Sequence, residues 1–420
     1  MRVKKLLSVL GPGIFAIGYT IGTGSVTAMA TAGAKYGLQL LWVLFLSCLF
    51  SGLLMDAYGR FAVVTGNTSL QGIRKHLPCG KLLAILIFIG VCMGQYTCMG
   101  GILTLSSGAI VEMCSLFSLF FPRSPGEYHL IALGVAAAII AVMFSLMLIG
   151  RYSFFEKLLA FFVMLMGLTF LVSMFVVWPD AEVMKRALPP AVPHDAASLL
   201  MLASFVGTTM AAPTFVTRPL LLREKNLGVE NLGEQRADAV FSASLMFVIS
   251  GAIMFVATGA LFAHGKEIVK VLDMAHTLQP LAGRFAVALF MVGTLSAGLS
   301  SIFPIMMVAP LLLSDYQSGK METKTARFRV LCLIASLFSL LVPALGNNPI
   351  LITIMAQVSN VFVLPLTILA IFLLLNNRKI MGRYKAGVGT NIGLIFAFLF
   401  ACAVAYTGYK ALALTITRGL

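Results

Sequence analysis

The amino-acid sequence predicts an all-α protein that lies within a membrane. Of its 420 residues, 60% are hydrophobic and only 11% are charged, and the mean hydropathy is +0.99. Soluble domains carry about 25% charged residues, so this composition excludes an ordinary soluble protein. A helix that spans a bilayer needs roughly 20 apolar residues. About eleven such stretches fill the chain and leave no room for a separate soluble domain.

The apolar stretches predict eleven spanning helices joined by short loops. Their length and low charge are typical of membrane helices rather than of buried helices in a soluble protein. The helices are expected near residues 11–32, 38–64, 81–112, 128–150, 155–178, 198–222, 238–263, 282–314, 327–345, 349–375 and 388–412.

Lysine and arginine fall mostly on one side of the predicted helices. If the N-terminus is cytoplasmic, 21 of the 30 basic residues lie in cytoplasmic segments, and nine lie on the other side. Cytoplasmic loops of membrane proteins carry such an excess. The sequence therefore predicts a protein of the plasma (cytoplasmic) membrane with a cytoplasmic N-terminus. After eleven helices, the C-terminus is expected on the outer side.

The composition gives no indication of other partners or of catalysis. The formal charge of +15 is spread over short loops, without a basic stripe interleaved with aromatic residues, so nucleic-acid binding is not expected. The seven cysteines form no CxxC pair, which argues against a disulfide framework or a metal cluster. The predicted helices hold no paired carboxylates and no histidine at depth. We therefore expect no enzymatic activity and no cofactor.

The first apolar stretch is interrupted at its centre. Gly22-Thr23-Gly24-Ser25 combines two glycines, a β-branched residue and a serine, which are all weak helix formers. A break in a membrane helix leaves backbone N–H and C=O groups without partners, and it is tolerated only where protein or a water-filled cavity surrounds it. The interruption therefore predicts a binding site in the middle of the membrane.

The sixth apolar stretch contains a second interruption. Gly207-Thr208-Thr209 is expected to end one half-helix, and Pro213 suits the first turn of the next because that turn does not need its missing N–H. The two interrupted stretches lie five helices apart, so they enter the membrane in opposite orientations. Paired interruptions in two inverted halves are typical of secondary transporters. Glycines that merely allow close helix packing are the alternative interpretation.

Short motifs also follow one another along the chain in a specific order and spacing. They are Gly11-Pro12-Gly13, the run AGAKYGLQLLWVLFLS at 32–47, Arg60, Val64-Thr65-Gly66, the run EKLLAFFVMLMGLTF at 156–170, Ala297-Gly298-Leu299-Ser300-Ser301, Gln357, Leu364-Pro365 and Asn377-Arg378-Lys379-Ile380-Met381-Gly382. With these motifs the sequence, from Gly11 to about Gly382, resembles the NRAMP family of divalent-metal transporters, as a divergent branch of it.

The resemblance implies the leucine-transporter fold, which has two repeats of five helices in inverted orientation, followed here by one additional helix. Residues 1–180 would form the first repeat and residues 181–376 the second. Residues 377–420 would contain the additional helix, all within one membrane domain. The resemblance further implies transport of a divalent metal cation by alternating access around the two interrupted helices.

The residues at the expected site depart from the family pattern. Where the family has DPGN, this chain has Gly22-Thr23-Gly24-Ser25, so the carboxylate is absent and a hydroxyl replaces the Asn. Where the family has MPH, the aligned residues are Ala211-Ala212-Pro213, so the thioether that favours soft metals is absent as well. The third apolar stretch also lacks the family's acidic residues for proton movement. Proton coupling is therefore doubtful, and we expect weak pH dependence.

The predicted substrate-binding residues are those that remain at the two interruptions, together with one glutamine of the tenth stretch. They are Gly22, Thr23, Gly24, Ser25, Thr208, Thr209, Met210, Ala211, Thr214 and Gln357. All are neutral, and unwound carbonyl groups near Thr20–Gly22 and Ser204–Thr208 would add oxygens. If a metal ion binds, its expected ligands are Ser25, Thr209 and Gln357 with these carbonyls.

Charged residues near the interruptions leave a second kind of substrate open. The half-helices that begin near Thr23 and Pro213 present free N–H groups, which favour an anionic group. Arg218 would add a cation there, unless it is a topology or gate residue toward the inner face. Asp56 and Arg60 are spaced i, i+4 and are expected to form a structural ion pair. These three residues are the candidates for gating or charge.

The sequence thus predicts a secondary-type carrier for a small solute, which by resemblance is a divalent metal cation. A carrier for a small polar or zwitterionic organic solute and an uncoupled channel are the alternatives. The expected partners are this solute or cation and the lipid bilayer. The sequence indicates no oligomeric state.

Overall fold

The chain folds into long helices at the places that the apolar stretches predict. The computed structural model describes residues 11–116, 122, 124–149, 152–190, 196–264, 271–321, 323–345 and 349–417. The first half contains α2 (Gly11–Thr20), α3 (Thr23–Tyr36), α4 (Leu41–Thr65), α5 (Ser69–His76), α6 (Gly80–Leu116), α7 (Pro125–Leu148), α8 (Tyr152–Val176) and α9 (Ala181–Ala187). The second half contains α10 (Ala196–Thr209), α11 (Ala212–Val216), α12 (Arg218–Glu224), η1 (Val229–Asn231), α13 (Leu232–Ala260), η2 (Phe262–His264), α14 (Val271–Gln317), α15 (Ala326–Ser339), α16 (Leu341–Leu345), α17 (Pro349–Asn376), α18 (Arg378–Met381), η3 (Gly382–Tyr384) and α19 (Val388–Thr417).

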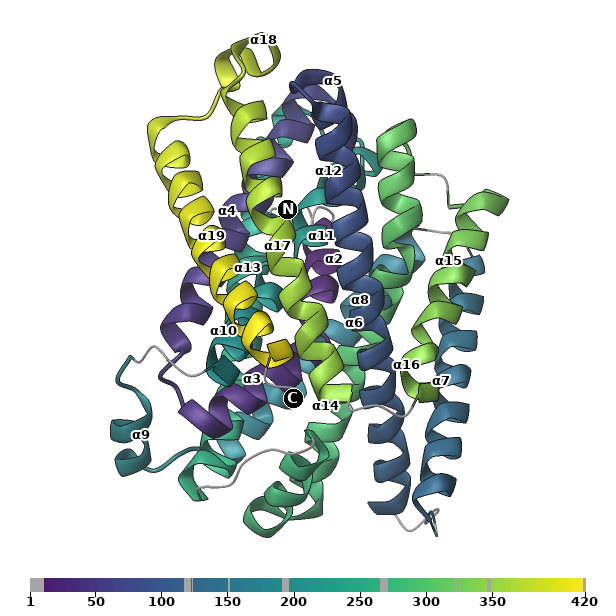
Figure 1. The fold of residues 1–420 in the computed structure, drawn as a ribbon, viewed down its shortest axis with the longest axis vertical. Coiled ribbons are helices and arrows are strands. Elements are labelled where there is room, and N and C mark those ends of the chain that lie inside the picture. The colour runs from purple at the N-terminus through teal and green to yellow at the C-terminus, as the bar shows by residue number, and fades with distance from the viewer. Residues whose placement is uncertain are drawn as a thin grey trace.

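The helices form one bundle that is suited to a membrane. Within the described residues, ten helices are long and apolar enough to cross a bilayer, and the bent pair α2 and α3 raises the number to eleven. The long helices run mostly along the vertical axis of Figure 1. The predicted all-α membrane architecture with about eleven spanning helices is therefore confirmed.

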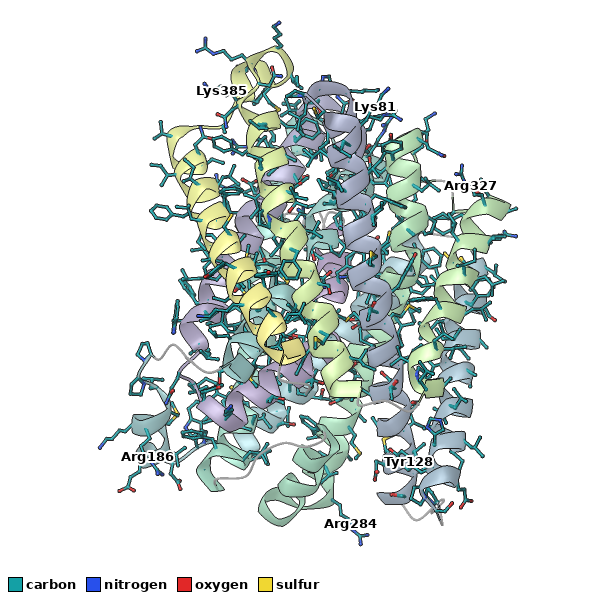
Figure 2. The ribbon with its side chains drawn as sticks, viewed as in Figure 1. Lys81, Tyr128, Arg186, Arg284, Arg327 and Lys385 are labelled. Atoms are coloured by element: carbon teal, nitrogen blue, oxygen red, sulfur yellow. The ribbon has the colours of Figure 1, made fainter. Side chains whose placement is uncertain are left out.

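Basic residues that the sequence analysis assigns to the same side lie at the same end of the bundle. Lys81, Arg327 and Lys385 lie at one end in Figure 2, and Arg186 and Arg284 lie at the opposite end. We call the first of these the Lys385 end. The grouping of these five residues is confirmed, while the cytoplasmic position of the Lys385 end stays a prediction.

The two interrupted helices lie in the interior of the bundle. In the span Ser198–Val216, 94% of the apolar window is buried, whereas only 22% is buried in the span Val388–Ala413 of α19. All residues from Thr23 to Ala30 of α3 are buried as well. α3 packs against α6, α10, α13, α14 and α17, so long helices surround it on several sides. The surrounding helices therefore enclose both interruptions in protein. This is required because a break in a membrane helix leaves backbone N–H and C=O groups without partners.

Two of the expected helices differ in detail from the prediction. The helix expected over 282–314 begins earlier, at Val271, and bends at Gly283, which has φ 72°. A positive φ of this kind suits glycine, which lacks the Cβ that would clash. The helix expected over 327–345 is divided into α15 and α16 at Leu340. Both differences lie away from the interruptions.

The short helix α5 was not predicted by the sequence analysis. It lies between α4 and α6, near the Lys385 end of the bundle (Figures 1 and 2). The buried carboxylate of Asp315, in α14, accepts hydrogen bonds from the backbone N–H groups of Leu70 at 3.1 Å and Gln71 at 3.2 Å. A carboxylate at a helix N-terminus satisfies N–H groups that have no partner within the helix. Because Asp315 lies 245 residues from Leu70, no local pattern predicts this helix.

Candidate functional site

The first interruption is shorter than the sequence analysis predicted. α2 ends at Thr20 and α3 begins at Thr23, and the two half-helices are bent by 54°. Only Ile21 and Gly22 lie between them, so Thr23, Gly24 and Ser25 form the first turn of α3. Because of this bend, the first turn of α3 and its unbonded N–H groups face the centre of the bundle.

Gly22 allows α14 to approach the bend closely. A Cβ atom placed on Gly22 would lie 2.5 Å from the Oγ of Ser301 and 2.9 Å from its Cβ. The Ser301 hydroxyl donates a hydrogen bond of 2.6 Å to the backbone O of Gly18, in the last turns of α2. The serine of the AGLSS motif therefore satisfies a carbonyl at the end of the first half-helix.

The second interruption supplies another donor to the same half-helix. The hydroxyl of Thr208 in α10 donates to the backbone O of Thr20 at 2.8 Å. In turn, the hydroxyl of Ser51 in α4 donates to the backbone O of Thr209 at 2.7 Å. Carbonyl groups at both interruptions are thus bonded by hydroxyls of neighbouring helices, which stabilises the two breaks in an apolar bundle.

We expect the substitution Ser301→Ala to lower the free energy of unfolding by about 1–3 kcal/mol, because the buried carbonyl of Gly18 would lose its hydroxyl donor. Thermal unfolding in detergent measures the effect. Ser300→Ala is the matched control, since among the described residues the Ser300 hydroxyl donates to the backbone O of Ala297 alone, within its own helix, at 2.9 Å. Equal effects of the two substitutions would contradict the assigned role of Ser301.

The second interruption has the predicted form and continues further than expected. α10 ends at Thr209, and α11 begins at Ala212 with Pro213 in its first turn. α11 ends at Val216, and α12 begins at Arg218 after the single residue Thr217. The predicted residues Met210, Ala211 and Thr214 are buried at this interruption.

Gln357 of α17 lies against both interruptions. A Cβ on Gly24 would lie 2.9 Å from the Nε2 of Gln357, and a Cβ on Gly207 would lie 2.0 Å from its backbone O. The glycines therefore allow both broken helices to contact the same residue of α17. The structure thus brings Gly24 and Gln357, two of the predicted binding residues, to one buried point.

A polar network that the sequence analysis did not predict joins α6 and α17 at this point. The Nε2 of Gln357 donates to the Sγ of Cys98 at 3.0 Å, and the Nδ2 of Asn360 donates to the Oε1 of Gln357 at 3.3 Å. The Nε2 of Gln95 donates to the Oδ1 of Asn360 at 3.2 Å. The i, i+3 spacing of Gln95 and Cys98, and of Gln357 and Asn360, was the available signal, because it places each pair on one helix face.

Several buried hydroxyls near the interruptions have no hydrogen-bond partner within the described residues. They include Ser25 and Thr214, which are predicted site residues, and Ser106 of α6. A Cβ on Gly298 would lie 2.0 Å from the Oγ of Ser106 and 3.1 Å from a methyl carbon of Thr23, so α3, α6 and α14 meet here. Unpartnered buried hydroxyls in a native structure are typical of positions where water, an ion or a ligand binds.

The proposed metal ligands are not all equally available. The hydroxyl of Thr209 donates to the backbone O of Phe205 at 3.0 Å, within its own helix. Gln357 keeps its Oε1 beside Asn360, and Ser25 keeps an unpartnered hydroxyl. Over the residues that the structure describes, no group of three or more His, Cys, Asp or Glu side chains is placed to hold a metal ion.

The three charge candidates belong to one network, which runs from the buried Arg218 to the partly exposed Arg60. Arg218 is fully buried, its Nη2 lies 2.8 Å from the Oδ2 of Asp238 in α13, and it donates to the backbone O of Gln235 at 2.9 Å. The Nε2 of Gln235 donates to the Oδ1 of Asp56 at 2.7 Å, and Arg60 lies 3.7 Å from Asp56. The predicted ion pair of Asp56 and Arg60 is confirmed, and Asp238 and Gln235 are new members.

Two interrupted helices that meet inside a bundle, with ten or eleven spanning helices in the described part of the chain, define a multi-pass membrane transporter. Comparison with known proteins gives its family. The family model described as "Natural resistance-associated macrophage protein-like" matches residues 13–409, so the chain belongs to the Nramp family. The predicted family is therefore confirmed.

Relatives with curated names agree with this assignment. The divalent metal cation transporter MntH of Bacillus subtilis is 25% identical over 404 residues, which cover 90% of this chain and 86% of the relative. A protein of the same name from Verminephrobacter eiseniae is 26% identical over 415 residues, with 96% of this chain and 88% of the relative covered.

Solved structures of similar fold include a manganese transporter and two proteins with small organic molecules bound. A manganese transporter of Eremococcus coleocola has a TM-score of 0.72 at 15% identity, and 97% of this chain and 88% of that chain are covered. MhsT in complex with L-phenylalanine has a TM-score of 0.64 at 14% identity, covering 96% of this chain and 98% of that chain. The nucleobase-cation-symport-1 transporter Mhp1 has a TM-score of 0.60. The leucine-transporter-type fold is confirmed by these likenesses.

Proposed function

We propose that this protein is a carrier that moves a divalent metal cation across the membrane by alternating access around its two interrupted helices. One observation carries the proposal: Gly24 and Gly207, which lie next to the two interruptions, both contact Gln357 at a buried point of the bundle. Membership of the Nramp family and the names of the MntH relatives support the cation as substrate. Neither the interruptions nor the family favours an enzyme.

The site would bind the cation with neutral ligands. Gln357 offers an amide oxygen and Ser25 an unpartnered hydroxyl, which are oxygen ligands that hard cations accept. The backbone carbonyls at the interruptions that already accept a hydroxyl would use their second lone pair. Cys98 is hydrogen-bonded to Gln357, but a cysteine binds metals as the thiolate, so it is not counted among these neutral ligands. Without a carboxylate the cation would keep part of its water shell. We expect dissociation constants on the order of 10⁻⁴–10⁻³ M, as in other weak oxygen sites.

The proposal also includes the orientation of the protein in the membrane and a weak coupling of transport to protons. The Lys385 end carries residues assigned to the basic side and is the cytoplasmic end, with the N-terminus inside and the C-terminus outside. The site residues Thr23, Ser25 and Gln357 do not titrate near neutral pH. An inward proton gradient is therefore expected to change the initial rate of uptake by less than about tenfold. A larger increase would show a proton pathway elsewhere in the bundle.

A small zwitterionic solute is the second candidate, and the neutrality of the site favours it. The first turn of α3 points unbonded N–H groups toward the centre, and such groups bind carboxylates. Arg218 does not add to this site as a free cation, because Asp238 neutralises it at 2.8 Å. The organic solute therefore has fewer charged contacts than the sequence analysis expected.

Uptake into proteoliposomes separates the two substrates. Purified protein would be reconstituted and tested with Mn²⁺, Fe²⁺, Mg²⁺ and Ca²⁺, and separately with a panel of amino acids, against protein-free vesicles. We expect saturable uptake of at least one cation, with binding in calorimetry at millimolar concentration, and slow saturable flux rather than single-channel currents. Cation-independent amino-acid uptake without any metal binding would replace the metal proposal with the second candidate.

Gln357→Leu tests the position of the site. Loss of the amide oxygen is expected to reduce cation uptake at least about tenfold, because the cation loses a ligand. The leucine side chain also leaves Cys98 and Asn360 without their hydrogen bonds to Gln357. Gln39→Leu is the matched control, since Gln39 is half-buried in the turn between α3 and α4, and the whole of α3 separates it from the first interruption. Equal uptake by the two variants would exclude Gln357 from the site.

A further inference from the structure

A basic pocket lies where α4 and α13 approach η3 and Lys385. It has a volume of about 340 Å³, and its lining includes Arg60, Arg236, Arg383 and Lys385, with Asp56 as its acidic residue. These residues come from α4, α13 and the segment that precedes α19, so three separate parts of the chain enclose it. Lys385 marks its position at one end of the bundle in Figure 2. Four cations thus face one carboxylate.

The positive charge of this pocket is largely uncompensated. Arg236 and Lys385 are exposed and make no ion pair or side-chain hydrogen bond with another described residue. The guanidinium of Arg383 stacks over the ring of Tyr384 at 4.8 Å, which leaves its charge in place. Asp56 is the carboxylate of the pocket, and Arg60 and Gln235 already engage it. The pocket therefore suits an anion with several acceptor oxygens, such as a phosphate group.

An apolar groove of about 370 Å³ continues from the basic pocket between α4 and α13. Asp56 and Arg236 line both cavities, so the pocket and the groove lie next to each other. Phe45, Leu49 and Val248 line the groove and are 53%, 53% and 44% exposed, as expected of a surface that faces lipid. From Arg236 to Val248 the groove runs about 18 Å along α13, which is somewhat more than half of the hydrocarbon thickness of a bilayer.

We propose that this pocket and groove bind an anionic phospholipid of the leaflet at the Lys385 end. The phosphate and headgroup lie among Arg236, Arg383 and Lys385, and an acyl chain lies in the groove against α4 and α13. Basic pockets between membrane helices recognise anionic headgroups in this way. The length of the groove matches a chain that extends through one leaflet, and a soluble phosphate would leave this groove unused.

Such a lipid would connect three elements and lie next to the buried network. It would contact α4, α13 and the segment before α19, and Asp56 at the junction is bonded through Gln235 to Arg218. Because an anion neutralises the repulsion among the cations, bound lipid is expected to stabilise the arrangement seen here.

Native mass spectrometry tests the headgroup site on the full-length protein in detergent with added lipid. We expect dioleoyl phosphatidylglycerol to remain bound and dioleoyl phosphatidylcholine to dissociate. The double variant Arg236→Gln/Lys385→Gln should bind phosphatidylglycerol roughly tenfold more weakly or worse. The matched control is Lys324→Gln/Arg329→Gln, which removes two exposed cations that do not line the pocket. Equal binding of the two lipids, or equal losses in the two double variants, would overturn the proposal.

A second measurement tests the groove and separates lipid from free anion. Phosphatidylglycerol should raise the temperature of thermal unfolding, and inorganic phosphate at the same concentration should not. Ser244→Trp, which fills the exposed groove, should abolish this increase, whereas Ile395→Trp on the lipid-facing side of α19 should keep it. An increase with phosphate alone, or no difference between the two tryptophan variants, would refute a lipid chain in the groove.

Discussion

The substitution Arg218→Met is expected to lower the free energy of unfolding by about 3–5 kcal/mol, because it leaves the carboxylate of Asp238 buried without its partner. Both side chains are 0% exposed, so water does not replace the lost guanidinium. The buried pair joins α12 to α13, and a hydrogen bond to Gln235 adds a second link. Thermal unfolding in detergent and the yield of folded protein after size exclusion measure the change.

Two further variants show whether the loss comes from the unpaired charge. The double variant Arg218→Met/Asp238→Leu should recover much of the stability, since apolar replacement of both partners removes the buried charges. Lys225→Met is the control, because Lys225 and Glu156 form a pair whose side chains are 12% and 22% exposed, so its loss should cost less than the loss of a fully buried partner. A loss with Arg218→Met no larger than with Lys225→Met would refute a structural role for the buried pair.

The role of Arg218 could not be predicted from the sequence. Its position five residues after Pro213 allowed two interpretations, a substrate contact or a gate residue. Only the fold places Asp238 of α13 beside it, and this partner removes Arg218 as a free cation at the interruptions. The neighbouring pair of Asp56 and Arg60 was predictable, because its spacing lies within one helix.

For the fold and the binding site as well, features set by nearby residues were predictable and features set by tertiary packing were not. Apolar length alone predicts the spanning helices, and weak helix formers predict the interruptions at Gly22 and after Thr209, because both signals are local. Cys98 and Ser301 contact the interruptions from helices that lie far away in sequence, and their roles depend on tertiary packing. The interior face of a membrane helix has no distinct hydrophobic pattern, since lipid and protein core are both apolar.

Close approach of α10 to α17 is the packing feature on which the site depends most directly. Gly207 lies one residue before Thr208, and a Cβ at this position would lie 2.0 Å from the backbone O of Gln357 and 2.9 Å from Val361. These neighbours are a backbone atom and a β-branched side chain, which have little freedom to move. Any side chain at position 207 must therefore push the second interruption away from Gln357.

We expect Gly207→Ala to reduce the initial rate of uptake at least about tenfold and to lower the free energy of unfolding by about 1–3 kcal/mol. Gly251→Ala is the matched control, because Gly251 is a buried helical glycine of α13, and no described atom beyond its own stretch of helix backbone lies within 4 Å of the added Cβ. That control should keep its transport rate and gain about 0.5–1 kcal/mol from the better helix former. Since the two variants add the same methyl group inside a helix, opposite signs of the two stability changes would isolate the contact with Gln357. Full transport by Gly207→Ala would mean that the tight contact of α10 with α17 is not needed for the transport cycle.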